Sequence, residues 1–238
     1  MRKIFSSPLG ILFITLIIAG IGVGIYFGVK SGNENSGTTT AALRQNFRVT
    51  YYNTEGTNIQ DGFSNYLNQA MTFWEDKLNE DTVIDLDVKA FPLDDPRILA
   101  YGSMNNRGNI RGGGDITINL NAVAMRWQDV LKHEIGHVMG IGLAYTWTDA
   151  VIRNENGVFL RSTSFPETYQ IYANEYGGIF NHIPLGDSAG HFDESIFTTE
   201  LMTPYSNEGQ DQPATDLTLS ALSVLGWDID LSKAEERN

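Results

Sequence analysis

Two histidines one helical turn apart constrain this chain more than any other feature. The segment His133–His137 reads His-Glu-Ile-Gly-His, and it lies in a stretch, about residues 122–139, that we expect to be helical. Side chains four residues apart lie one above the other on the same face of an α-helix. The two imidazoles can therefore bind one zinc ion together, and Glu134 is close enough to reach a water molecule on that ion. The alternative is a helix that carries two surface histidines and no metal.

A zinc ion at this helix needs another ligand from elsewhere in the chain. Hydrolytic zinc sites usually combine three protein ligands with one water molecule. The downstream candidates are His182, His191, Glu167, Glu175, Glu194 and Glu200. Glu167 or Glu175 would give a gluzincin-type site with two histidines and a glutamate, whereas His182 or His191 would give three histidines. Residue type and spacing alone leave these alternatives open.

Three motifs follow one another in order along the second half of the chain. His133–Gly140 has the pattern H-E-x-x-H-x-x-G, and His191-Phe192-Asp193-Glu194 follows it after a long insertion. Glu200-Leu201-Met202-Thr203-Pro204 then follows, before a segment that ends in Leu-Gly-Trp. This order resembles that of the metzincins, and most closely that of the leishmanolysin-like metallopeptidases. The resemblance covers roughly residues 115–230.

The resemblance implies a zinc-dependent endopeptidase with one zinc ion per chain. The ligands would be His133, His137 and His191, with His182, Glu167 or Glu175 as the alternative third ligand. Zinc would lower the pKa of its bound water, and Glu134 would take the proton and pass it to the leaving amine. The partner would be a protein or peptide substrate.

The resemblance also assigns roles around the metal. Met202 would belong to a turn that forms an apolar floor under the zinc, and Gly140 would end the active-site helix. Tyr205 is a candidate contact for the zinc or for the oxyanion. The strand expected at residues 115–120 would be the sheet edge that pairs with an extended substrate. Glu194 and Glu200 are expected to be local hydrogen-bond partners.

Some residues depart from the family pattern. Ordinary metzincins have their third histidine six residues after the second, and that position here is Leu143. His191 instead follows His137 by 54 residues, a gap that only the leishmanolysin-like insertion explains. Phe192 replaces the tryptophan of the family's H-W pair. The chain has no cysteine, so disulfides, thiolate ligands and any cysteine-based latency are excluded.

Hydrophobic periodicity predicts an α+β fold, and the resemblance implies that this fold is of the metzincin-like zincin type. The expected strands are 47–52, 83–91, 98–101 and 115–120, and the expected helices are 62–79, 122–139 and one from about 217 to Gly226. The strands and the first two helices would form an N-terminal lobe at about 45–142, with a mixed sheet and the active-site helix. Residues 143–238 would form a largely irregular C-terminal lobe, and 45–238 together would be the metallopeptidase domain.

The N-terminus has the composition of a membrane segment. Arg2 and Lys3 precede an uncharged run from Leu9 to Val29, which would span ~30 Å as a helix, about one hydrocarbon core. We expect residues 1–30 to be a transmembrane anchor, with a cleaved signal peptide as the alternative, and residues 31–44 to be a flexible linker. Either interpretation places the catalytic domain outside the cytoplasm, membrane-anchored in the first case and secreted in the second.

Charge excludes one class of partner. The net charge is −13, and residues 1–30 contain three basic residues and no acid, so the remainder is more acidic still. Nucleic-acid binding requires lysine and arginine to neutralise phosphates, and this composition therefore argues against it. Two functions of different class remain: an active endopeptidase, or a zinc-bound adhesion or binding module whose catalysis has lapsed. The presence of Glu134 favours the enzyme, because a lapsed enzyme could lose its base freely.

Overall fold

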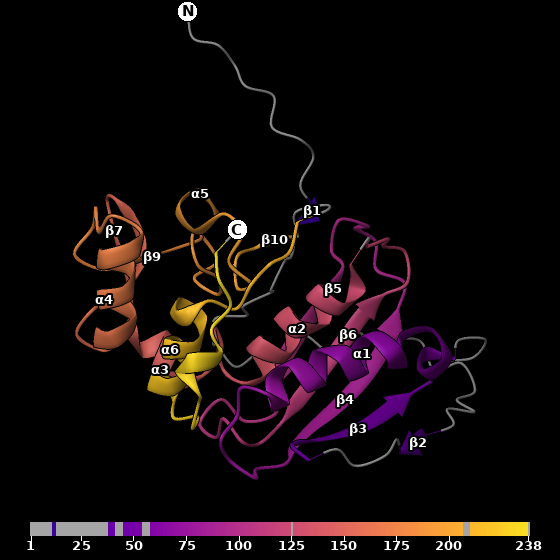
Figure 1. The fold of residues 1–238 in the computed structure, drawn as a ribbon. Helices are drawn as coiled ribbons and strands as arrows, with labels where there is room; N and C mark the ends of the chain where they lie inside the picture. The colour runs from indigo at the N-terminus through magenta and orange to yellow at the C-terminus, as the bar shows by residue number, and fades with distance from the viewer. Residues whose placement is uncertain are drawn as a thin grey trace, which may run out of the picture.

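A mixed β-sheet, two long helices and a C-terminal region of shorter elements make up the fold (Figure 1). This computed structural model describes residues 11–12, 38–40, 45–53, 58–124, 126–206 and 210–237. Within them the chain is α+β, as the periodicity predicted. After residue 45 the first half runs strand, helix, three strands and helix, and the segment His133–His137 lies on the second of these helices.

Four strands form the main sheet: β3 (Phe47–Tyr52), β4 (Ile84–Phe91), β5 (Ala100–Met104) and β6 (Gly114–Asn119). Their order is β3-β4-β6-β5, and all neighbours are parallel except β5, which runs antiparallel to β6. The three-residue strand β2 (Thr38–Thr40) adds to β3 on the other side. The expectation that residues 115–120 form the sheet edge was wrong. Strand β6 lies inside the sheet between β4 and β5, and β5 is the edge strand on that side.

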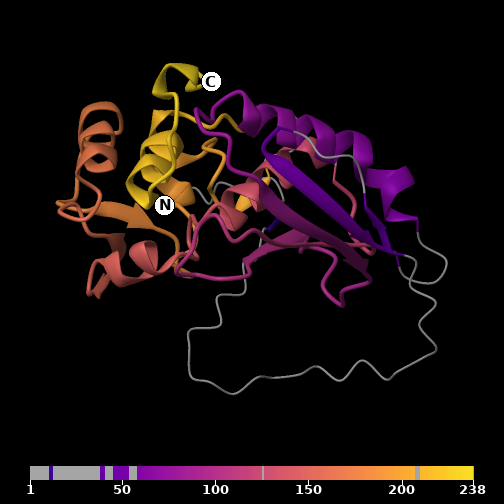
Figure 2. The same cartoon turned by 90° about the horizontal axis from the view of Figure 1, so that it is seen from below.

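Helices α1 (Ile59–Glu75) and α2 (Trp127–Val138) pack against each other over one face of this sheet (Figures 1 and 2). Helix α1 begins before the predicted residue 62, because the side chain of Asn58 caps the helix by accepting a hydrogen bond from the N–H of Asp61. Helix α2 is shorter than the predicted 122–139 at its N-terminal end. Between β6 and α2 the described chain turns at residues 120–121, so the polypeptide reaches the helix face of the sheet before α2 starts.

The C-terminal end of α2 is set by two glycines with left-handed backbones. Gly140 has φ +114° and Gly142 has φ +76°, values that other residues rarely adopt. Helix α2 therefore ends just before Gly140, as predicted. A Cβ atom on Gly142 would lie 2.4 Å from the carbonyl oxygen of Gly190. The chain that leaves the helix thus passes directly against the segment that carries His191.

Residues 143–215 are more regular than the sequence predicted. They contain helices α3 (Tyr145–Ala150), α4 (Pro166–Glu175) and α5 (Glu194–Phe197), and strands β7 (Val151–Asn154), β8 (Gly157–Leu160), β9 (Ile183–Leu185) and β10 (Tyr205–Ser206). Strands β7, β8 and β9 form an antiparallel sheet. Strands of two to four residues are too short to show alternation, and α3 and α5 have only six and four residues, whereas the ten-residue helix α4 was missed. The division into lobes near residue 142 stays a prediction.

The last helix lies where the pattern placed it. Helix α6 (Asp216–Leu225) starts at Thr215, whose side chain accepts a hydrogen bond from the N–H of Leu217, and a short 3₁₀ helix (Leu231–Lys233) follows. Gly226 ends α6 in the left-handed conformation, with φ +111°. Trp227 follows, and its indole N–H donates to the carbonyl oxygen of Met139 at the end of α2. The C-terminal segment is thereby fixed to the helix that carries the motif.

Most of the predicted membrane run and linker lies outside the described residues. Of residues 9–29 the structure describes only β1 (Ile11–Leu12), which pairs with β10. None of the helices that the structure describes is both long enough and apolar enough to cross a membrane.

Candidate metal centre

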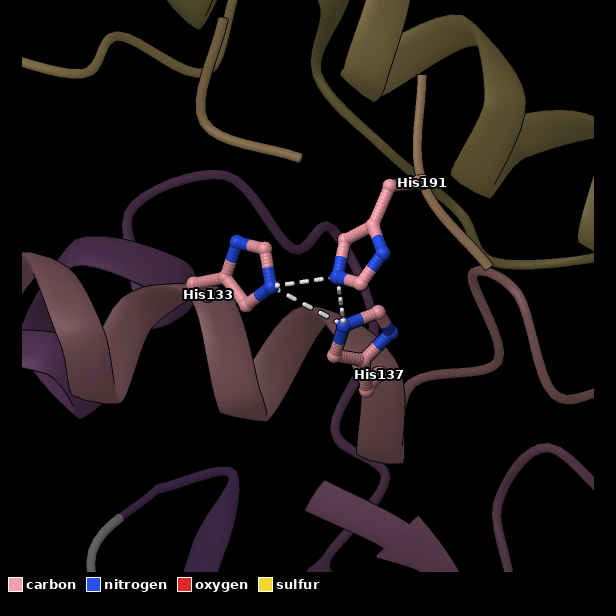
Figure 3. A group of neighbouring side chains, drawn as sticks. All are labelled: His133, His137 and His191. Atoms are coloured by element: carbon pink, nitrogen blue, oxygen red, sulfur yellow. Dashed lines mark hydrogen bonds between the residues drawn. The ribbon is translucent and has the colours of Figure 1, made fainter. Parts of the chain in front are cut away.

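Three histidine side chains converge at one buried point (Figure 3). His133 and His137 lie on α2, and His191 lies between β9 and α5. The Nε2 atoms of His133 and His137 are 2.9 Å apart, and each is 3.1 Å from Nε2 of His191. Each side chain is at most 1% exposed. Within the described part of the chain, they form the one group of three or more metal-binding side chains close enough to share an ion.

Backbone carbonyls orient the two helical histidines. Nδ1 of His133 lies 2.7 Å from the carbonyl oxygen of Leu201, and Nδ1 of His137 lies 2.8 Å from that of Ile141. A carbonyl oxygen only accepts, so each Nδ1 carries the proton and each Nε2 presents a lone pair. Lone pairs that face each other at these distances repel unless a cation lies between them. The geometry therefore fits a bound metal ion, with the outer hydrogen bonds that metal-binding histidines usually make.

The segment that carries His191 is closed by its own backbone and attached to its neighbours. The N–H of Gly186 donates to the carbonyl oxygen of His191 at 3.0 Å, which closes a turn. The N–H of Phe192 donates to the carbonyl oxygen of Met202, also at 3.0 Å. Ser188 Oγ lies 3.5 Å from Nδ1 of His191. His191 is thus held between its own turn and the segment around Met202.

Burial sets the protonation state of the cluster. Loss of solvation lowers the pKa of all three imidazoles below the usual 6.5, and that of His137 falls to about 4. Neighbouring imidazoles lower the pKa of His133 and His191 further. All three rings are therefore neutral at pH 7. Neutral imidazole is the form that binds a metal, so the site needs no deprotonation before binding.

Glu134 follows His133 on α2, and its carboxylate lies in an unusual environment. The side chain is 1% exposed, a backbone hydrogen bond from Gly102 reaches it, and its Oε2 has no hydrogen-bond partner among the described residues. Burial raises the pKa of Glu134 to about 8, although the hydrogen bond from Gly102 lowers it. A dication next to this carboxyl would favour its ionised form. One carboxylate oxygen is thus fixed, and the other remains available to a ligand.

Gly102 was missed by the sequence analysis. A Cβ atom at this position in β5 would lie 2.5 Å from the backbone oxygen of Glu134, so only glycine lets the strand approach α2 this closely. The sequence did contain a signal for it, because a glycine inside a strand often marks a position where another part of the backbone approaches closely.

Met202 packs beneath the helix, between its two histidines. A Cβ atom on Gly136 would lie 2.6 Å from Sδ of Met202, which shows that the thioether lies directly against the glycine of the motif. Met202 is fully buried. Its side chain thus contacts the helix at the residue before His137. The role of Met202 as an apolar floor under a metal ion stays a prediction.

Glu200 fixes the turn that carries Met202. Its carboxylate is fully buried and accepts hydrogen bonds from the hydroxyl of Thr218 at 2.5 Å, from the hydroxyl of Thr215 and from the N–H of Thr215 at 3.3 Å. These bonds attach the turn to the first residues of α6. The next residue, Leu201, supplies the carbonyl that orients His133. The prediction that Glu200 is a local hydrogen-bond partner is therefore confirmed.

The Glu200→Gln variant should lose less stability than the wild type as the pH rises. Burial raises the pKa of Glu200 to about 7 from 4.5, against the hydrogen bonds that lower it. A raised folded-state pKa means that the contribution of this carboxyl to stability is complete below pH 4.5 and is lost as the pH rises through 7. Glutamine does not titrate. The unfolding free energy of the wild type minus that of the variant should therefore fall by about 3 kcal/mol between acidic and alkaline pH.

Urea unfolding of both metal-free proteins at pH 4.5 and pH 8.5 measures this difference. The three histidines and Glu134 titrate in both proteins, so their contributions cancel. A difference that stays constant between the two pH values would show that Glu200 is ionised throughout.

The other sequence candidates lie away from the cluster. Nδ1 of His182 is 3.3 Å from the N–H of Ser162 and 3.2 Å from its hydroxyl, and the ring is not part of the group. Glu167 and Glu175 lie on α4 and do not belong to it either. The backbone carbonyl of Tyr205 in β10 accepts a hydrogen bond from Gln212 at 2.7 Å. The contact of Tyr205 with a metal or an oxyanion stays a prediction.

Fold and site together define an α+β protein with a buried three-histidine centre of the kind that can hold one metal ion. Comparison with protein-family models, with curated proteins and with solved structures gave no match to this chain.

Proposed function

We propose that the protein is a zinc-dependent endopeptidase of the metzincin-like type. The observation that carries the proposal is the convergence of three neutral imidazoles at a helix that also carries Glu134, whose buried carboxylate has an oxygen available to a ligand. Three histidines with one open position are typical of catalytic zinc, whereas structural zinc sites are usually closed by four protein ligands. The described cluster contains no fourth ligand.

The donor set favours zinc over the hard cations. His133, His137 and His191 offer only nitrogen, while calcium and magnesium require oxygen ligands. Zinc bound there would supply Lewis acidity and a water of lowered pKa.

The protein's own residues would move the proton. Glu134 accepts it from the attacking water and returns it to the leaving amine, a role that requires the carboxylate to lie within hydrogen-bond reach of both. The hydrogen bond from Gly102 holds one side of the carboxylate in place during both transfers. Burial excludes bulk water from the carboxylate, so its proton affinity is set by the site.

An extended peptide would bind along β5. This strand is an edge of the described sheet, and its residue Gly102 touches the backbone of Glu134. In the antiparallel pair of β5 and β6, Tyr101 lies opposite Thr117. In such a pair the backbone N–H and C=O groups of every second residue point away from the partner strand, so along β5 they can bond to a substrate strand. A substrate strand that pairs with this edge would pass next to Glu134.

The second candidate function is a zinc-bound binding module without activity. The burial and fixed position of Glu134 favour the enzyme, because a binding module has no need for a carboxylate with an available oxygen in an apolar environment. Digestion of unfolded casein by the full-length protein tests the choice. The enzyme should stop cleaving when a chelator removes the metal and resume when zinc is returned. Metal binding without cleavage of a broad peptide library would favour the binding module.

We further propose that the N-terminal run anchors the protein in a membrane with the metal centre outside the cytoplasm. The support is the uncharged sequence from Leu9 to Val29 behind Arg2 and Lys3. The chain should stay in the membrane fraction after alkaline carbonate washing, and protease added to intact cells should degrade its C-terminal part. A soluble form that starts near residue 30 would show a cleaved signal. Protection of the C-terminal part would contradict the external location.

A further inference from the structure

Three of the four tryptophans hold the backbone next to the three histidines. Trp74, Trp147 and Trp227 are each at most 2% exposed. Their indole N–H groups donate to the carbonyl oxygens of Lys132 at 3.0 Å, of Ala189 at 2.9 Å and of Met139 at 2.7 Å. Each acceptor lies one or two residues from one histidine. The three bonds come from α1, from α3 and from the segment after α6.

The bond from Trp147 differs from the other two in what it fixes. Lys132 belongs to α2 and Met139 is its C-cap, so the helix already determines where His133 and His137 lie. Ala189 belongs to residues 186–190, which form neither helix nor strand. Its φ is +60°, in the left-handed region that residues other than glycine rarely adopt. This carbonyl is therefore placed by tertiary contacts rather than by regular structure.

The ring of Trp147 also packs against the residue that follows His191. Its centroid lies 5.7 Å from that of Phe192, the residue after the histidine, and the rings are inclined at 61°. Phe165 packs against Trp147 from a third direction, at 5.6 Å. One side chain thus bonds to the backbone two residues before His191 and packs against the residue that follows it. The insertion that separates His191 from His137 supplies this side chain.

We infer that Trp147 is a positioning residue for the third metal ligand. Its indole N–H holds the carbonyl of Ala189, and with it the turn that directs His191 toward the two helical histidines. The inference rests on the proposed metal site, but it concerns metal affinity and geometry rather than cleavage.

The test compares Trp147→Phe with Trp227→Phe in the full-length protein. Both variants keep an aromatic ring and remove one buried indole bond to a backbone carbonyl, so Trp227→Phe controls for general destabilisation. Loss of a partner bonded directly to a metal ligand typically weakens metal binding by ~10–100-fold, and because Trp147 acts through the backbone of Ala189 we expect a factor of about ten. The zinc dissociation constant, measured by competition with a chromophoric chelator, should rise by that factor in Trp147→Phe and stay within about threefold of the wild type in Trp227→Phe.

Two further measurements separate positioning from stability. Urea unfolding of the metal-free variants gives their stability, and the visible absorption of the Co²⁺-loaded proteins reports the geometry of the ligands. We expect the absorption of Trp147→Phe to change and that of Trp227→Phe to match the wild type, whatever their unfolding midpoints. Equal zinc affinities in both variants, or affinities that simply follow the midpoints, would overturn the inference.

A second substitution covers the case in which Trp147→Phe does not fold. Benzothienylalanine at position 147 has the shape of tryptophan with sulfur in place of the N–H, so it removes the bond alone. The same loss of affinity is expected, and wild-type affinity would overturn the inference. A wild-type protein that binds no zinc would instead contradict the proposed function, which distinguishes the two failures.

Discussion

Replacing Glu134 by glutamine is expected to reduce casein cleavage by at least ~100-fold while the protein keeps its zinc. Glu134 is not one of the three converging nitrogen donors, so its replacement leaves the ligand set intact. Glutamine has nearly the same shape but cannot accept the proton of the attacking water. General-base catalysis typically contributes ~10²–10⁴-fold, or ~3–5 kcal/mol of barrier.

The stability of the same variant provides the control. The carboxyl of Glu134 is fully buried and its pKa is raised, so the neutral amide should be accepted without loss of the fold. Zinc content, unfolding midpoint and cleavage rate should be measured on the same preparation. Cleavage that equals the wild type would show that Glu134 is not the base. A loss of zinc in parallel with activity would show that the carboxylate contributes to metal binding.

The replacement of His191 by alanine should remove most of the bound metal. It deletes one of three nitrogen ligands, a larger change than the loss of an outer partner, which alone costs ~10–100-fold in affinity. We therefore expect the zinc dissociation constant to rise by more than ~100-fold. Metal content after dialysis and competition with a chelator measure the change.

His182→Ala is the matched control for this variant. It removes the other histidine of the same region, which is bonded to Ser162 and stands apart from the cluster. Its zinc affinity should equal that of the wild type. The opposite result, in which His182→Ala loses the metal and His191→Ala keeps it, would contradict the ligand assignment.

The local part of the site could be predicted from the sequence. His133, Glu134 and His137 are fixed relative to one another by the geometry of a single helix, and four-residue spacing is enough to place two imidazoles together. Gly140 and Gly226 mark helix ends for an equally local reason, since the left-handed conformation favours glycine. Strands β4 and β6 of the main sheet were visible because apolar and polar residues alternate along their sequences.

The third ligand could be named only by resemblance, because several residues downstream offer suitable donors. The structure brings His191 to the helix rather than His182, Glu167 or Glu175. What selects it is a set of contacts between distant segments. Gly142 lies against Gly190, and Trp147 bonds to Ala189.

Tertiary structure also decided which strand faces the site. The pattern identified residues 115–120 as a strand, but alternation reports burial and says nothing about neighbours. Only the sheet order shows that β5 takes the edge and that Gly102 brings it onto Glu134. The sequence by itself determined the helix with its two ligands and base, because these depend on neighbouring residues. The complete centre depends on packing between residues more than fifty positions apart, which no local periodicity records.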